Sequence, residues 1–160
     1  MGRYIERAED TARLLDVTYH NMLEVAPGEA TAGWGELLQV LFVDSGFDGD
    51  VTDSQAVTHY VVLDPDNAAS IRSSVRRGRH NARGLRDRIS TELWESMNSF
   101  YLELNARDVR AELARHPYEV YRWVRNQCQL LSGVASETMP RDDGYRFLVL
   151  GRWLERAEMT

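Results

Sequence analysis

The side chains best suited to chemistry lie in two copies of one charged phrase. The segment GRYIERAEDT at residues 2–11 returns as GRWLERAEMT at residues 151–160, with seven of ten positions identical. Each copy carries Arg, Glu and Arg at a spacing that shares one side of a helix. The six residues are Arg3, Glu6 and Arg7 in the first copy and Arg152, Glu155 and Arg156 in the second.

Two interpretations of this Glu-Arg motif compete. One copy alone favours a solvated helix face with weak ion pairs, because Glu6 lies away from the apolar stripe of Tyr4, Ala8 and Leu15. A solvated face does not need to keep its residues identical in two distant segments. Gly151 in mid-helix costs about 1 kcal/mol relative to Ala unless another helix crosses there. We therefore expect the two motifs at equivalent helix positions, near each other across the fold.

A second chemical feature is a basic segment, since residues 67–88 hold seven arginines and one acid. If one helix runs to about Ile89, five of the arginines form a stripe beside its apolar face. These are Arg72, Arg76, Arg79, Arg83 and Arg86. Their mutual repulsion requires something anionic opposite. Carboxylates of neighbouring helices, from Glu6, Glu9, Glu155 or Glu158, are the plainer alternative, and a bound anion or acidic partner is the other. Nucleic acid fits poorly, because the chain has a net charge of −6.

Several mechanisms are excluded by composition or disfavoured by spacing. All 19 basic residues are arginine, so the chain has no P-loop lysine and no Schiff-base lysine. His20, His59, His80 and His116 are too widely spaced to suggest a metal site. Cys128 lies among helical residues and is expected to be a buried thiol. We predict no catalytic residue, no metal and no cofactor.

The hydrophobic pattern is helical almost throughout, and predicts an all-α antiparallel bundle of about five to seven helices. The first helix runs from Gly2 to about Glu24 and ends at Pro27 and Gly28. QAVTHYVVL is ambiguous on propensity, and its helical neighbours favour a helix. Asp64 or Asp66 is the expected N-cap of the basic helix. No stretch is long and apolar enough for a membrane span, and the charged N-terminus with one cysteine predicts a cytoplasmic protein.

The second phrase stops in mid-pattern at Thr160, so we expect residues 1–160 to form a single helical domain within a longer repeated unit. The apolar side chains of this last helix would then have no neighbouring segment packed against them. They are Leu150, Trp153, Leu154 and Ala157. Since exposing such a face is costly, we expect the isolated chain to self-associate or to be poorly stable as a monomer.

Three blocks in order resemble the Alpha-E family, a bacterial helical domain of unknown function named for its helices and Glu-Arg motif. They are GRYIERAEDTARLLDV, IRSSVRRGRHNARGLRDRIS followed by ELWESMN, and PRDDGYRFLVLGRWLERAEMT. The resemblance covers nearly the whole chain, although family members look roughly twice as long. Alpha-E domains are encoded beside, or fused to, circularly permuted ATP-grasp proteins, and occur near transglutaminase-like proteins.

That setting implies a role in an amide-ligating or peptide-tagging system, with an ATP-grasp protein as partner. Two roles are open. In one, the chain is a non-catalytic accessory module that docks on the ligase or presents its substrate. In the other, the arginine stripe and the Glu-Arg motifs contribute an anion-binding or substrate-binding site. The chain has no lysine, no metal-binding spacing and no nucleophile motif. These three absences favour the accessory role.

Overall fold

The computed structural model describes residues 1–24 and 30–159, and its regular elements there are all helices. The α-helices are α1 (Gly2–Glu24), α2 (Ala30–Val40), α3 (Ser54–Val62), α4 (Ile71–Gly84), α5 (Thr91–Ala106), α6 (Val109–Arg115), α7 (Pro117–Thr138) and α8 (Asp143–Glu158), with a 3-10 turn, η1, at Asp44–Gly46. The all-α prediction is confirmed, and the ambiguous QAVTHYVVL segment is helical. The described residues hold eight α-helices, above the expected five to seven, and the turn expected at Pro27 and Gly28 lies outside them.

Side-chain caps set several helix starts. Ser90 caps α5 by accepting a hydrogen bond from the Leu93 amide, and Asp142 caps α8 in the same way from Tyr145. The start of α4 differs from expectation: its cap is Ser70, whose Oγ accepts from the Ser73 amide at 3.1 Å. Asp64 instead accepts from the Asp66 amide at 2.8 Å, and so stabilises the preceding turn.

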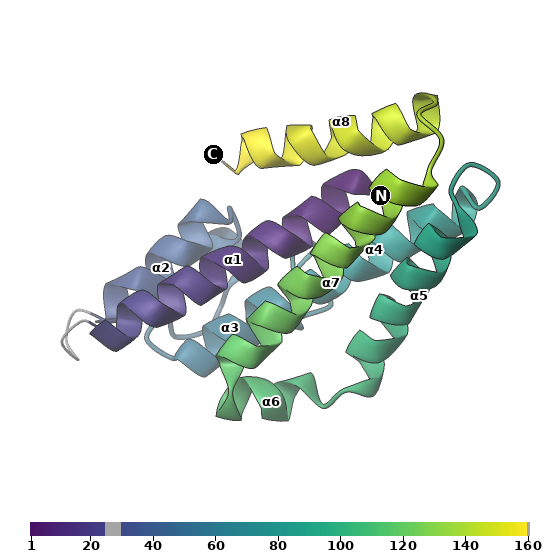
Figure 1. Cartoon of the computed structure of the whole chain (residues 1–160). Coiled ribbons are helices and arrows are strands. Elements are labelled where there is room, and N and C mark those ends of the chain that lie inside the picture. Colours follow the sequence, from purple (N-terminus) through teal and green to yellow (C-terminus); the bar gives the residue numbers. More distant parts are fainter. Residues whose placement is uncertain (25–29, 160) are drawn as a thin grey trace.

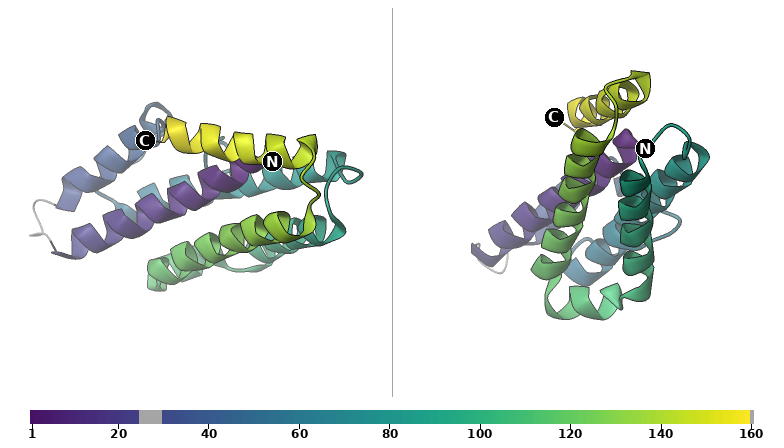
Figure 2. Two further views of the ribbon diagram at one scale, coloured as in Figure 1. Left: turned by 45° about the horizontal axis from the view of Figure 1, so that its top comes forward. Right: turned by 45° about the vertical axis from the view of Figure 1, so that its right-hand side comes forward.

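The first helix is the centre of the molecule. α1 packs against α7, α8 and α4, so most of its circumference is covered (Figure 1). α5 lies between α4 and α7, and the short α6 joins α5 to α7. Figure 2 shows α8 set apart from α5 and α7, lying along the first half of α1 and running in the same direction. The position of α8 therefore depends mainly on its contact with α1.

The core fills the space between α1, α4, α5 and α7. Its largest buried apolar side chains include Leu15, Ile71, Leu93, Met97, Phe100, Leu104, Tyr121 and Leu131. Among the described helices, none has both the length and the apolar composition needed to cross a lipid bilayer.

Candidate functional site: the paired Glu-Arg motifs

The two charged phrases meet. The carboxylate of Glu6 on α1 accepts hydrogen bonds from two arginines of α8, with Arg152 Nε at 2.9 Å from Oε2 and Arg156 Nε at 2.7 Å from Oε1. Glu6 is 0% exposed. A buried carboxylate is tolerated when two charge-assisted donors saturate it, and that is the arrangement found.

The second glutamate repeats the arrangement in the opposite sense. Glu155 on α8 is 1% exposed and accepts from two arginines of α1, with Arg3 Nε at 2.8 Å from Oε2 and Arg7 Nε bonded to Oε1. Arg3 also pairs with Glu158. Each motif therefore supplies one carboxylate and two guanidinium groups to the other, and we call these six residues the Glu-Arg clasp.

The clasp requires the two helices to run side by side in register. Glu6 lies between Arg152 and Arg156, just as Glu155 lies between Arg3 and Arg7. This reciprocity matches the parallel direction of α1 and α8 in Figure 1. Both copies therefore need the same Arg-Glu-Arg spacing, because the glutamate of each helix accepts from two arginines of the other.

Glycines permit the close approach. A Cβ on Gly2 would lie 2.1 Å from the carbonyl oxygen of Leu148, which is shorter than any real contact. A Cβ on Gly151 would lie 3.3 Å from the backbone nitrogen of Arg3 and 3.8 Å from the Cα of Gly2. The helix crossing predicted from Gly151 is therefore present, and Gly2 is its counterpart.

The solvated-face interpretation of the motif is wrong. It rested on the angle between Glu6 and one apolar stripe, whereas α8 covers a further side of α1.

The hydrogen bond to Glu155 raises the pKa of Arg3, and that to Glu6 raises the pKa of Arg156. Arg3 and Arg156 therefore remain cationic, and the two carboxylates are covered from solvent.

More carboxylates lie next to the clasp on α1. Glu9 and Asp10 are both buried, and Arg13 pairs with each, at 3.3 Å and 3.2 Å. Burial, and then the charge of Glu6, raise the pKa of Asp10. Sequence reasoning treated Glu9 only as a counter-ion for α4 and missed Asp10, although both lie three or four residues beyond Glu6.

A cavity of about 460 Å³ adjoins the clasp on the side of Arg7 and Glu155. Thr11, which is 1% exposed, lines it, and its hydroxyl has no hydrogen-bond partner among the described residues. Phe42 also lines the cavity and has a φ of 54°, a left-handed conformation that is unusual for an aromatic residue. The carboxylates of the clasp are therefore covered, and the cavity leaves one edge of the clasp open.

The arginine stripe is placed differently from expectation. α4 ends at Gly84, so Arg86 lies in the turn beyond it, and the stripe does not belong to one helix. Arg79 donates to Asn98 at 2.8 Å and lies over the ring of Tyr101, 4.5 Å from its centroid. Arg86 lies over Trp94 at 5.0 Å. Aromatic faces of α5 therefore take the place that carboxylates were expected to fill.

Within the described ranges, no salt bridge joins a carboxylate to any stripe residue, and Glu6, Glu9, Glu155 and Glu158 pair elsewhere. Arg76 lines a small cavity of about 330 Å³ with Tyr4, Arg77, His80 and Asn81. Arg72 Nε is buried without a hydrogen-bond partner among these residues. The stripe is not brought to the clasp, and its five members do not converge on one point.

The other reactive side chains show no constellation. Among the described residues, no group of three or more His, Cys, Asp or Glu side chains is arranged to hold a metal ion. Cys128 is buried on α7, as expected, and burial raises the pKa of its thiol well above its ordinary value. That thiol is a poor nucleophile in the folded chain.

The family comparison agrees with this geometry. Residues 1–160 match Alpha-E, described as a predicted alpha-helical domain with a conserved ER motif, and the chain belongs to that family. The clasp is where its two Glu-Arg motifs lie.

Similar proteins come from mycobacteria. The uncharacterized protein Mb2597 of Mycobacterium bovis is 29% identical over 180 residues, and Rv2567 of Mycobacterium tuberculosis is 28% identical over the same length. In both cases the alignment covers 98% of this chain and 20% of the relative. The chain thus spans about one fifth of the length of these curated relatives. No solved structure matches it significantly.

Proposed function

We propose that this chain is a non-catalytic helical interaction module of a bacterial ATP-grasp-linked amide-ligation or peptide-modification system. The observation that carries the proposal is the use of both Glu-Arg motifs inside the molecule. A general acid, base or nucleophile must reach the substrate. The carboxylates of Glu6 and Glu155 face arginines instead and have almost no contact with solvent. Their role is then to hold α8 on α1.

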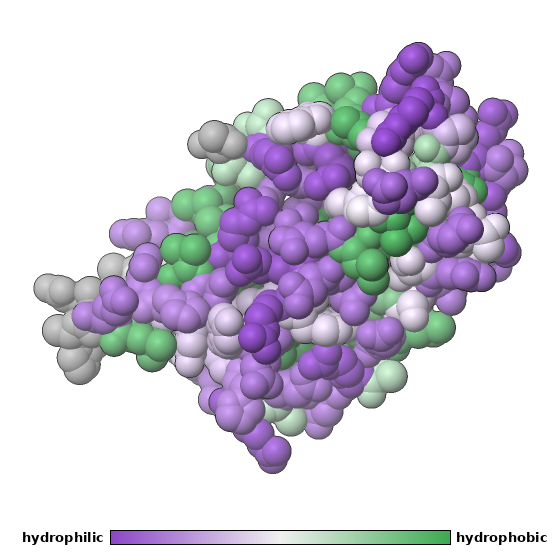
Figure 3. Space-filling model, in the orientation of Figure 1, coloured by the Kyte–Doolittle hydropathy of each residue, from purple (hydrophilic) through white to green (hydrophobic). Residues whose placement is uncertain are grey.

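Holding α8 in this way presents its outer side. Phe147, Leu150, Trp153 and Leu154 are 72%, 50%, 60% and 49% exposed, and we call them the α8 outer face. Apolar surface lies along the edge that α8 forms in the space-filling view (Figure 3). Four such side chains expose roughly 500 Å², which is the size of a functional patch. Trp is also among the residues that dominate binding energy at interfaces.

The partner that we propose for this face is a circularly permuted ATP-grasp protein. Support comes from the family setting, in which Alpha-E domains are encoded beside or fused to such proteins. The mycobacterial relatives add a second line of support, because their matched region is a fifth of a much longer chain. A module of this kind is expected to act within a larger polypeptide or assembly.

The test is co-purification with the ATP-grasp protein encoded next to the gene for this chain. Leu150→Glu and Trp153→Glu should abolish co-purification, since each places a charge in the apolar contact. Leu102→Glu on α5 is the matched control, because Leu102 is 54% exposed and Leu150 is 50% exposed. Equal retention of the partner by all three variants would reject the α8 outer face as the docking site.

A second role is favoured by the small cavity around Arg76. Two arginines and His80 converge there with Tyr4 and Asn81, a set of donors suited to a phosphate or carboxylate group. The chain would then contribute an anion-binding or substrate-binding site to the ligase. Calorimetric titration with ATP, phosphate and acidic peptides tests this role. Binding that Arg76→Ala removes and Arg83→Ala retains would support it, and the absence of binding would leave only the docking role.

A further inference from the structure

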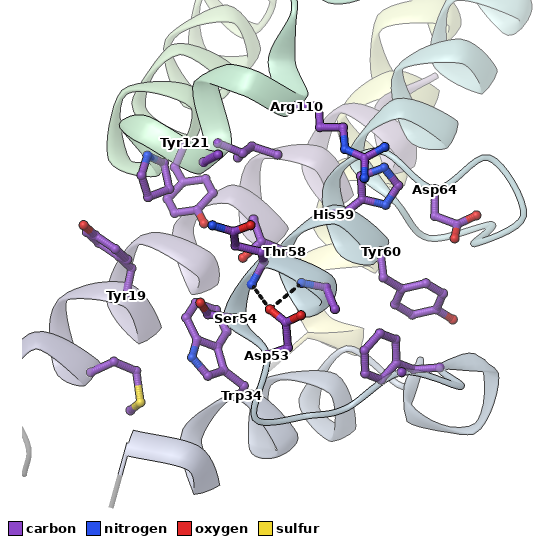
Figure 4. A pocket seen from close by; sticks show the side chains of 18 of the residues that line it. Tyr19, Trp34, Asp53, Ser54, Thr58, His59, Tyr60, Asp64, Arg110 and Tyr121 are labelled. Atoms are coloured by element: carbon purple, nitrogen blue, oxygen red, sulfur yellow. Dashed lines mark hydrogen bonds between the residues drawn. The ribbon is translucent and has the colours of Figure 1, made fainter. Parts of the chain in front are cut away.

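A large cavity lies at the other end of α1 from the clasp. It measures about 750 Å³ and is walled by α1, α2, α3, α6, α7 and the turn after η1 (Figure 4). Tyr19, Trp34 and Tyr121 line one part of it, and Phe47, Tyr60 and Asp64 another. None of the six clasp residues contributes to its walls.

A buried hydroxyl lies behind the inner wall of this cavity. Tyr121 is 0% exposed, and its hydroxyl makes no hydrogen bond of normal geometry to a described residue. Figure 4 shows the hydroxyl end directed inward, toward Thr58. Burial raises the pKa of Tyr121 to about 12, although a hydrogen-bonding contact with Thr58 acts in the opposite direction, so the phenol remains neutral.

The outer part of the cavity combines aromatic faces with negative charge. The rings of Phe47 and Tyr60 lie 5.1 Å apart between centroids. Burial raises the pKa of Tyr60, and the charges of Asp64, Asp48 and Asp44 raise it further, in that order. Asp48 and Asp64 also line the cavity together with Phe47 and Tyr60.

The wider surroundings have the same sign of charge. Residues 44–66 hold six aspartates and no arginine. Arg110 is the one arginine in the described lining and is itself exposed. The oxygens of Asp53 and Asp64 that accept backbone hydrogen bonds leave each residue a second carboxylate oxygen. A ligand entering here meets a negative potential and π faces, both of which favour a cation.

We propose that this cavity binds a small organic ammonium compound, with its cationic group against Phe47, Tyr60 and Asp64 and its apolar body toward Trp34 and Tyr121. The proposal goes beyond the docking function and concerns the chain alone, so either can fail without the other.

The ligand test compares three probes of one size and different charge. Phenethylamine, 2-phenylethanol and phenylacetate share the aromatic body and are cationic, neutral and anionic. Calorimetry on the whole chain should show saturable binding for the amine, weaker binding for the alcohol and none for the acid. Added salt should weaken amine binding. Equal affinity for amine and acid, or no saturable binding of the amine, would overturn the proposal.

The variant test locates the cation. Tyr60→Leu and Asp64→Asn should each weaken phenethylamine binding about tenfold, as expected for a partly desolvated cation contact. Asparagine keeps the oxygen that accepts from the Asp66 amide, so the turn is preserved. Asp66→Asn is the matched control, since Asp66 is exposed and absent from the lining. Unchanged affinity in folded Tyr60→Leu and Asp64→Asn proteins would contradict the assigned position.

Discussion

At the scale of single residues, Glu6 and Glu155 are the most sensitive positions of the clasp. Each is covered from solvent and balances two guanidinium groups of another helix. Glu158 also contacts Arg3, but its side chain is 58% exposed. The site therefore contains Arg–Glu ion pairs with a buried carboxylate and one with an exposed carboxylate. Substituting each kind separates the effect of burial on stability from the effect of charge.

We predict that Glu6→Gln and Glu155→Gln each lower the free energy of unfolding by about 3 kcal/mol, because two arginines lose their charged acceptor at a buried position. Glu158→Gln should cost less than about 1 kcal/mol. Urea unfolding followed by circular dichroism measures all three. A Glu6→Gln variant as stable as Glu158→Gln would show that the clasp contributes little to stability.

Asp10 gives a prediction about pH. Burial and then Glu6 raise its pKa in the folded chain, so the folded state holds this proton more tightly than the unfolded state. The ionisation of Asp10 therefore lowers stability as pH rises from the ordinary aspartate value of about 3.9 through the raised value. Relative to the unsubstituted chain, Asp10→Asn should gain stability over that window and keep the gain at neutral pH.

Thermal melts of both proteins across this pH range give the difference directly. Asp66→Asn removes the same charge at an exposed position and reports the effect of net charge alone. A difference between Asp10→Asn and the unsubstituted chain that does not vary with pH would contradict the prediction.

At the scale of elements, the α1–α8 crossing depends on backbone contact. Ala at Gly2 would place a methyl group inside the Leu148 carbonyl, while Ala at Gly151 meets Arg3 at a distance that small shifts can relieve. We predict that Gly2→Ala destabilises the α8 contact more than Gly151→Ala does. A methyl group at Gly133 on α7 would meet no atom within 4 Å, so Gly133→Ala should add about 0.5–1 kcal/mol through helix propensity.

Hydrogen exchange of α8 amides distinguishes these variants, because exchange should accelerate in Gly2→Ala and remain slow in Gly133→Ala. Equal protection of α8 in both proteins would mean that the crossing tolerates a side chain at Gly2.

The sequence predicted the elements more fully than their contacts. Hydrophobic periodicity located α1 well, and the repeated phrase predicted that the two motifs would lie near each other. It did not predict that Glu6 is buried, because the angle to one apolar stripe describes a helix covered on one side, whereas α1 is covered on several. The partners of Arg79 and Arg86 were also missed, since helical periodicity describes one helix and does not show that α5 turns its aromatic rings toward these arginines.

At the scale of the whole molecule, α8 is held by one set of contacts and exposes another. Its inner side is fixed to α1 by the clasp, and its outer face carries Phe147, Leu150, Trp153 and Leu154 in contact with solvent. Such a helix provides a fixed apolar surface, because the clasp sets the orientation of α8 before any partner binds. The buried clasp thereby determines how the α8 outer face is presented to a partner.

We predict that the isolated chain self-associates through the α8 outer face. Two copies related by a two-fold axis would bring this face against itself and bury roughly 1,000 Å² in total, near the lower limit for a specific interface. Light scattering at micromolar concentration should show dimers that Trp153→Glu converts to monomers and that Leu102→Glu retains. A protein that docks on the same face, as we propose for an ATP-grasp protein, should compete with the dimer, so adding it should yield a mixed complex with one copy of this chain. A monomeric chain at this concentration would show instead that the α8 outer face does not pair with a second copy.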